Sequence, residues 1–218
     1  MACAICETRK EKRFCPAVHG RICPTCCGTE REVTLDCPST CDYLQQARRN
    51  ERPRHLGEID REALFPKVKL PEEVAELQEP LIGALGYAIV QVAQRDRSLL
   101  DRDVVAALTG VGKGYQTAIE SGLLYDAPLQ TPLQQRIASD LRRAILEYQQ
   151  SERKRLAYSV VSDSDALKAV VFLLRFALVR SNGRPRSRAF LDALEGGYPQ
   201  RDSLLVTPHD PGSRLIIP

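Results

Sequence analysis

The sequence predicts a two-part fold in which a small metal-stabilised domain precedes an all-α bundle of four or five helices. Two observations carry this prediction. All eight cysteines fall within the first 41 of 218 residues. From Pro71 to Tyr198 there is no cysteine, and apolar residues recur at helical spacing. We expect a cysteine-rich domain over residues 1–44, a charged linker over 45–70, the bundle over 71–197 and an irregular tail over 198–218.

The cysteines are expected to bind metal and not to form disulfides. The N-terminus has no basic start and no apolar stretch of signal-peptide length, so we expect a cytoplasmic protein, whose thiols stay reduced. Closed structural zinc sites take four thiolates, so eight thiolates suit two Zn²⁺ ions per chain. The expected ligands are Cys3, Cys6, Cys15, Cys23, Cys26, Cys27, Cys37 and Cys41.

The spacing suggests how the ligands divide between two ions. Two Cys-x-x-Cys pairs, each able to wrap a tight turn around one ion, assign Cys3, Cys6, Cys23 and Cys26 to the first zinc. The second zinc then takes Cys15, Cys27, Cys37 and Cys41, and the ligands interleave as in cross-brace or treble-clef zinc fingers. Neighbouring Cys26 and Cys27 would serve different ions, as an extended backbone permits. His19 is an alternative ligand in place of Cys27.

Other chemistry at the cysteines is less favoured. An iron–sulfur cluster is the minority alternative, because the tight cysteine run of two-cluster ferredoxins is absent. Catalytic zinc keeps an open position, which four thiolates per ion do not leave. Because so short a domain builds little core, the metals are expected to supply its folding energy.

Residues 26–33 (CCGTEREV), followed by Cys37-Pro38, Cys41 and Tyr43-Leu44, resemble the start of certain uncharacterised bacterial proteins. In these proteins a cysteine-rich head is joined to a helical body, and a weaker similarity continues from Asn182 to Phe190. The interleaved cysteine plan is also similar to B-box and MYND zinc modules, which bind proteins. The terminal histidine ligands of those modules are missing here.

Apolar stripes predict the helices of the bundle. They run over residues 74–92, 104–123, 133–148 and 164–181, and a short helix follows near 186–194. The stripe over 164–181 is apolar on nearly every face, which predicts a central, buried helix.

Enzyme motifs in the bundle have simpler interpretations. Gly110-Val111-Gly112-Lys113-Gly114 lacks the spacing and preceding strand of a phosphate-binding loop, so a helix break or close helix packing is expected. Asp163 and Asp165 follow Ser162 at a helix start, where acidic residues favour the helix dipole. No histidine lies between Pro71 and Tyr198 to activate a nucleophile. We therefore expect no catalytic site.

These observations predict a zinc-binding protein-interaction or scaffold module with a protein partner. The alternative is a nucleic-acid-binding regulator that contacts phosphate through Arg180, Arg184, Arg186 and Arg188, helped by the basic patch from Arg9 to Arg13. A redox or metal sensor is a third interpretation. A membrane protein is not expected, because no run of 18 apolar residues occurs.

Overall fold

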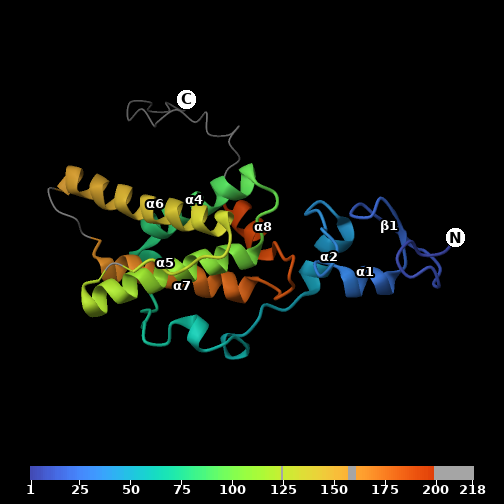
Figure 1. Cartoon of the computed structure of the whole chain (residues 1–218), viewed down its shortest axis with the longest axis horizontal. Coiled ribbons are helices and arrows are strands. Elements are labelled where there is room, and N and C mark those ends of the chain that lie inside the picture. The colour runs from blue at the N-terminus through green and yellow to red at the C-terminus, as the bar shows by residue number, and fades with distance from the viewer. Residues whose placement is uncertain (124, 157–160, 199–218) are drawn as a thin grey trace, which may run out of the picture.

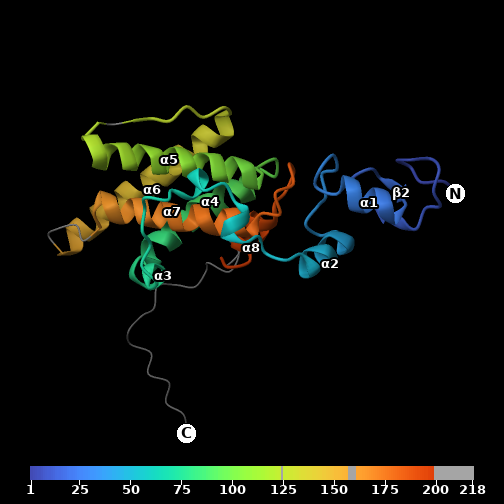
Figure 2. The same ribbon diagram turned by 90° about the horizontal axis from the view of Figure 1, so that it is seen from below.

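The computed structural model describes residues 1–123, 125–156 and 161–198, and these are mostly helical (Figure 1). Figures 1 and 2 show two parts arranged end to end along the long axis of the molecule. We call residues 1–50 the head and residues 71–198 the body. The tail predicted over 198–218 lies outside the described residues, apart from Tyr198.

The head combines a short hairpin with two helices. Strands β1 (Arg13–Cys15) and β2 (Gly20–Ile22) pair antiparallel, and α1 (Pro24–Glu30) and α2 (Asp42–Asn50) follow. Pro24 occupies the first position of α1, where its missing N–H leaves no hydrogen bond unmade. The extended backbone expected at Cys26 and Cys27 is wrong, because both lie in α1. Successive helical residues are about 100° apart, so the two thiols still leave the helix in different directions.

The segment between head and body lies along the body. It contains two 3₁₀ turns, Leu56–Glu58 and Glu62–Leu64, and its Phe65 side chain is buried in the core of the body. The Arg175 guanidinium donates hydrogen bonds of 2.9–3.0 Å to the carbonyls of Leu64, Phe65 and Val68. The linker predicted from charge and proline content is therefore anchored where it meets the bundle.

The described residues of the body form six helices. They are α3 (Val74–Leu77), α4 (Glu79–Arg95), α5 (Asp101–Ser121), α6 (Pro132–Leu156), α7 (Asp163–Arg180) and α8 (Ala189–Glu195). The predicted count of four or five was too low because the first stripe divides near Gln78 into α3 and α4. Pro80 explains the break, since its ring clashes with the carbonyl four residues earlier and it has no N–H.

Helix α7 is central, as its all-round apolar pattern predicted. It contacts α3, α4, α5 and α8, and eight of its apolar residues are buried. Burying one large aliphatic side chain contributes about 1.5–3 kcal/mol, so α7 is a main source of the stability of the body. None of the described helices has both the length and the apolar character needed to cross a bilayer.

The glycine run in α5 serves close packing. It lies inside the helix and does not follow a strand. A Cβ atom at Gly110 would lie 3.1 Å from Leu129, one at Gly112 would lie 2.9 Å from the Phe65 ring, and one at Gly114 would lie 2.8 Å from the Tyr125 carbonyl. Three different neighbours thus occupy the space that a side chain at these positions would need. Close packing therefore explains the glycines without a bound nucleotide.

Candidate metal centre

The first predicted set of four cysteines comes together in the head. The sulfur atoms of Cys3, Cys6, Cys23 and Cys26 all lie within 4.8 Å of one another. Cys3 and Cys6 come from the N-terminal loop. Cys23 is the residue between β2 and α1, and Cys26 lies in α1. Cys3, Cys23 and Cys26 are buried, and Cys6 is half-buried. This cluster of four thiols can hold a metal ion.

Backbone N–H groups reinforce the sulfur atoms of this cluster. The Cys23 N–H donates to Cys3 Sγ at 3.2 Å, and the Cys26 N–H donates to Cys23 Sγ at 3.4 Å. The second bond caps the N-terminus of α1, so the helix start and the ligand turn are the same local structure. Such donors stabilise negative charge on sulfur, as thiolate ligands require.

The proton affinities of the cluster differ strongly between members. The Thr8 hydroxyl, followed by the backbone N–H of Arg9, lowers the pKa of Cys6 to about 5. Burial, followed by hydrogen bonds shared with the other thiols, raises the pKa of Cys26 to about 12. Four adjacent thiolates repel one another, so their joint ionisation needs a cation among them. The donor set thus fits a metal ion better than four free thiols.

The second predicted set gathers around a different point. Cys15, Cys27, Cys37 and Cys41 all line one small cavity of about 10 Å³, a volume that holds about one water or ion at most. Within the described part of the chain, only the first set brings its sulfur atoms within 4.8 Å of one another. The second set therefore shares a cavity but is more widely spaced.

The thiols at this second cavity interact with one another and with a neighbouring arginine. Burial raises the pKa of the Cys37 thiol, and the nearby charges of Cys15 and Cys41 act in the same direction. The Arg13 guanidinium lies 4.5 Å from the centre of the Tyr43 ring, and its Nη1 donates to Cys27 Sγ at 3.7 Å. A cation thus lies against one of the four sulfurs. His19 is exposed in the turn between β1 and β2 and is not among the residues that line this cavity.

The four arginines of the alternative function do not form one free cationic surface. Arg180 is exposed at the end of α7. Arg184 donates to the carbonyls of Gly28 and Arg31 at the end of α1, where a cation also complements the helix dipole.

Arg186 and Arg188 are also engaged by the protein. Arg186 forms an ion pair with Asp36 of the head. Arg188 is only 8% exposed, and it donates to the carbonyls of Arg97 and Leu99 and to Glu195. Nucleic-acid binding through these arginines stays a prediction, with three of its four side chains already bound within the protein.

A polar junction between head and body was not predicted from the sequence. Its centre is Glu32, which is 1% exposed and accepts hydrogen bonds from Arg48 and Asn182 at 2.7 Å each. Asp192 of α8 accepts from Arg48 and from the Ser39 hydroxyl. A buried glutamate is rare unless paired, yet nothing in the local sequence distinguishes Glu32 from its exposed neighbours.

Comparison of the chain with protein-family models, with curated proteins and with solved structures gives no match.

Proposed function

We propose that this chain is a zinc-binding interaction module in which the metal ions are structural. The observation that carries the proposal is the compact cluster of Cys3, Cys6, Cys23 and Cys26. Four protein thiolates fill the tetrahedral coordination of zinc and leave no position for water or substrate. A site of this kind stabilises a small domain and has no catalytic role.

Two zinc ions per chain are part of this proposal. The second ion would use Cys15, Cys27, Cys37 and Cys41, whose sulfur atoms would have to move closer together around their shared cavity. Soft thiolate ligands suit Zn²⁺, and the absence of a ferredoxin-type cysteine run argues against an iron–sulfur cluster.

Native mass spectrometry of untagged protein purified without chelator tests the metal content. We expect two zinc ions per chain. A mass increase that corresponds to iron and inorganic sulfide would refute the structural-zinc proposal and make redox chemistry the leading hypothesis. A single zinc would limit the proposal to the first cluster.

The head is also the part proposed to contact a protein partner. Phe14 on β1 is 56% exposed, and Arg21 is its cross-strand neighbour on β2. Aromatic and arginine side chains are the residues most enriched at protein interfaces. Figure 1 shows β1 and the N-terminus at the end of the head that lies away from the helical body.

A pull-down with a matched pair of variants tests the interaction. Phe14→Ala is expected to abolish the retention of a specific protein from the cells that make this chain. Leu56→Ala, which truncates a 47% exposed side chain outside the head, is expected to retain it. Isolation of the wild-type chain as a clean monomer in repeated experiments would count against a scaffold role, and equal retention by both variants would exclude the hairpin as the contact surface.

A further inference from the structure

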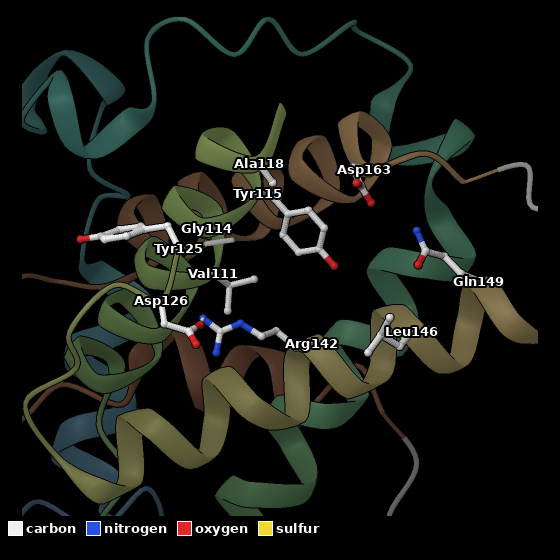
Figure 3. A pocket seen from close by; sticks show the side chains of 10 residues that line it. All are labelled: Val111, Gly114, Tyr115, Ala118, Tyr125, Asp126, Arg142, Leu146, Gln149 and Asp163. Atoms are coloured by element: carbon white, nitrogen blue, oxygen red, sulfur yellow. Dashed lines mark ion pairs between the residues drawn. The ribbon is translucent and has the colours of Figure 1, made fainter. Parts of the chain in front are cut away.

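The body contains a cavity that the proposed function does not use. It measures about 380 Å³ and lies between one face of α5, one face of α6 and the start of α7 (Figure 3). This volume falls within the range of about 300–1,000 Å³ typical of small-molecule sites. Its middle is apolar, with Val111 and Ala118 on α5 opposite Leu146 on α6.

The cavity is built into the helix packing. Residues 111, 114, 115 and 118 share one face of α5, and residues 142, 146 and 149 share one face of α6. Gly114 lets the Tyr125 carbonyl approach the helix, since a Cβ there would lie 2.8 Å from that oxygen. The segment at Tyr125 and Asp126 thereby closes one end of the space.

The other end of the cavity gathers hydrogen-bond acceptors. Gln149 donates its Nε2 to the Val161 carbonyl at 3.2 Å, which fixes the amide and leaves its Oε1 without a partner in the described part of the chain. Asp163 is an exposed residue at the first position of α7, and its carboxylate accepts no hydrogen bond and forms no ion pair within the described residues. Figure 3 shows the Gln149 amide, the Asp163 carboxylate and the Tyr115 hydroxyl at this same end.

The Tyr115 hydroxyl remains neutral under ordinary conditions. Burial, followed by the charge of Asp163, raises the pKa of Tyr115 to about 12. The phenol ring therefore keeps the electron-rich face that attracts cations.

Among the described residues that line the cavity, Arg142 is the only cation, and it is already paired. Arg142 Nη2 lies 2.7 Å from the Asp126 carboxylate, at the end opposite Asp163 (Figure 3). With Asp126 and Arg142 paired, the described lining carries one net negative charge, that of Asp163. The negative charge of Asp163 and the unpaired acceptor oxygens at its end of the cavity thus both favour a ligand with a cationic hydrogen-bond donor.

We propose that this cavity binds a small organic amine, a monocation with an apolar body. Its ammonium group would donate to the Asp163 carboxylate and to Gln149 Oε1, beside the ring of Tyr115. Its apolar part would lie between Val111, Ala118 and Leu146.

Three probes that share a phenylethyl or phenylpropyl skeleton test the charge requirement. Phenethylamine is a cation, 2-phenylethanol is neutral and 3-phenylpropanoate is an anion. Titrations of the full-length, metal-loaded chain followed by ¹H–¹⁵N NMR should show saturable binding of the amine, with shifts at Tyr115, Ala118 and Leu146. Binding should be weaker for the alcohol and absent for the carboxylate.

Variants separate the cavity from general effects of charge. Asp163→Asn should weaken phenethylamine binding by about fivefold or more, the equivalent of about 1 kcal/mol for a partly exposed ion pair. Glu79→Gln, which neutralises an exposed acid at the first position of α4, is the matched control and should leave affinity unchanged. Ala118→Phe should fill the cavity and abolish binding, while circular dichroism reports an intact fold.

Several outcomes would overturn the inference. Equal affinity for the amine and the alcohol would show an apolar cavity without a cation site. Unchanged affinity in Asp163→Asn would remove the proposed anchor, and tighter binding of the carboxylate would make Arg142 the anchor. The absence of saturable amine binding would refute the proposal outright.

Discussion

Arg48 of α2 donates from Nη2 to the carboxylate of Glu32 at 2.7 Å, and this bond lies at the centre of the contact between head and body. The other terminal nitrogen of Arg48 pairs with Asp192 of α8, while the second Glu32 oxygen accepts from Asn182. The backbone of Glu32 has a left-handed φ of 53°, which costs about 1 kcal/mol or more for a residue other than glycine. Such a conformation persists because the surrounding contacts hold it, so the head is fixed to the body through this residue.

Replacement of Arg48 is therefore expected to loosen the junction. Arg48→Ala leaves the buried Glu32 carboxylate without its cation, and the loss of one partner from a buried pair destabilises by about 3–5 kcal/mol. Hydrogen exchange should accelerate at residues 30–36 and 182–192. Arg49→Ala is the matched control, because Arg49 is the exposed next residue of α2. Equal exchange in the two variants would show that the ion pair does not hold the two parts together.

Removal of one thiol from the first cluster should unfold the head selectively. Cys23→Ser is expected to lower the zinc count from two to one in native mass spectra, because Cys23 is both a ligand and the cap of α1. Amide protection should be lost in residues 1–30, while far-ultraviolet circular dichroism retains the signal of the helical body. Thr25→Ala, at an exposed position of the same helix, should change neither. A head that keeps its protection in Cys23→Ser would show that the ligand assignment is wrong.

Local patterns predicted the helices and the first cysteine cluster well. Residues three or four apart meet on a helix face, so the apolar stripes contain the information that forms α5, α6 and α7. In the same way, two Cys-x-x-Cys turns need only one long-range approach to build the cluster of four. The exception was the first stripe, where the apolar pattern continues across Pro80 although the helix does not.

Contacts between distant residues could not be predicted. Arg48 meets Asp192 across 144 positions of the chain, and Arg184 meets the Gly28 carbonyl across 156. In the sequence Arg48 belongs to the predicted charged linker, and Arg184 belongs to the basic cluster typical of a solvated or phosphate-binding surface. Their carbonyl and carboxylate partners are recognisable only once the head lies against the body.

The arginines should accordingly differ in their effect on stability. Arg188→Ala leaves the carbonyls of Arg97 and Leu99 and the Glu195 carboxylate without their donor, so unfolding free energy should fall by about 2–3 kcal/mol. Arg180→Ala, at an exposed position, should change it by less than about 0.5 kcal/mol. Denaturant unfolding measures both. If instead the two variants are equally stable and both weaken salt-dependent nucleic-acid binding, the phosphate-binding interpretation gains over the structural one.

The start of α7 should contribute stability that depends on pH. Burial opposes ionisation of Asp165, but hydrogen bonds from Ser162 and Lys168 outweigh it and lower the pKa of Asp165 below its ordinary value of 3.8. Because the folded pKa is the lower one, this contribution is present above 3.8 and is lost as pH falls through the folded value. As the pH is lowered from above 3.8 to below the folded pKa, Asp165→Asn should therefore lose less thermal stability than the wild type. Parallel curves for the two proteins would contradict the assignment.

Packing of Phe65 against Gly112 is expected to make one small substitution harmful. A Cβ atom at Gly112 would lie 2.9 Å from the ring of Phe65, which is 5% exposed and holds the segment before α3 in the core. Gly112→Ala must displace this ring, and overpacking of that kind costs about 1–3 kcal/mol.

The control is Gly83→Ala in α4, where a Cβ would meet no atom within 4 Å. That variant should be more stable than the wild type by roughly 0.5–1 kcal/mol, because alanine is more favourable than glycine in a helix interior. Thermal unfolding should thus shift in opposite directions for two identical substitutions. Stabilisation by both would mean that Phe65 moves aside freely and that the segment before α3 is not anchored by its ring.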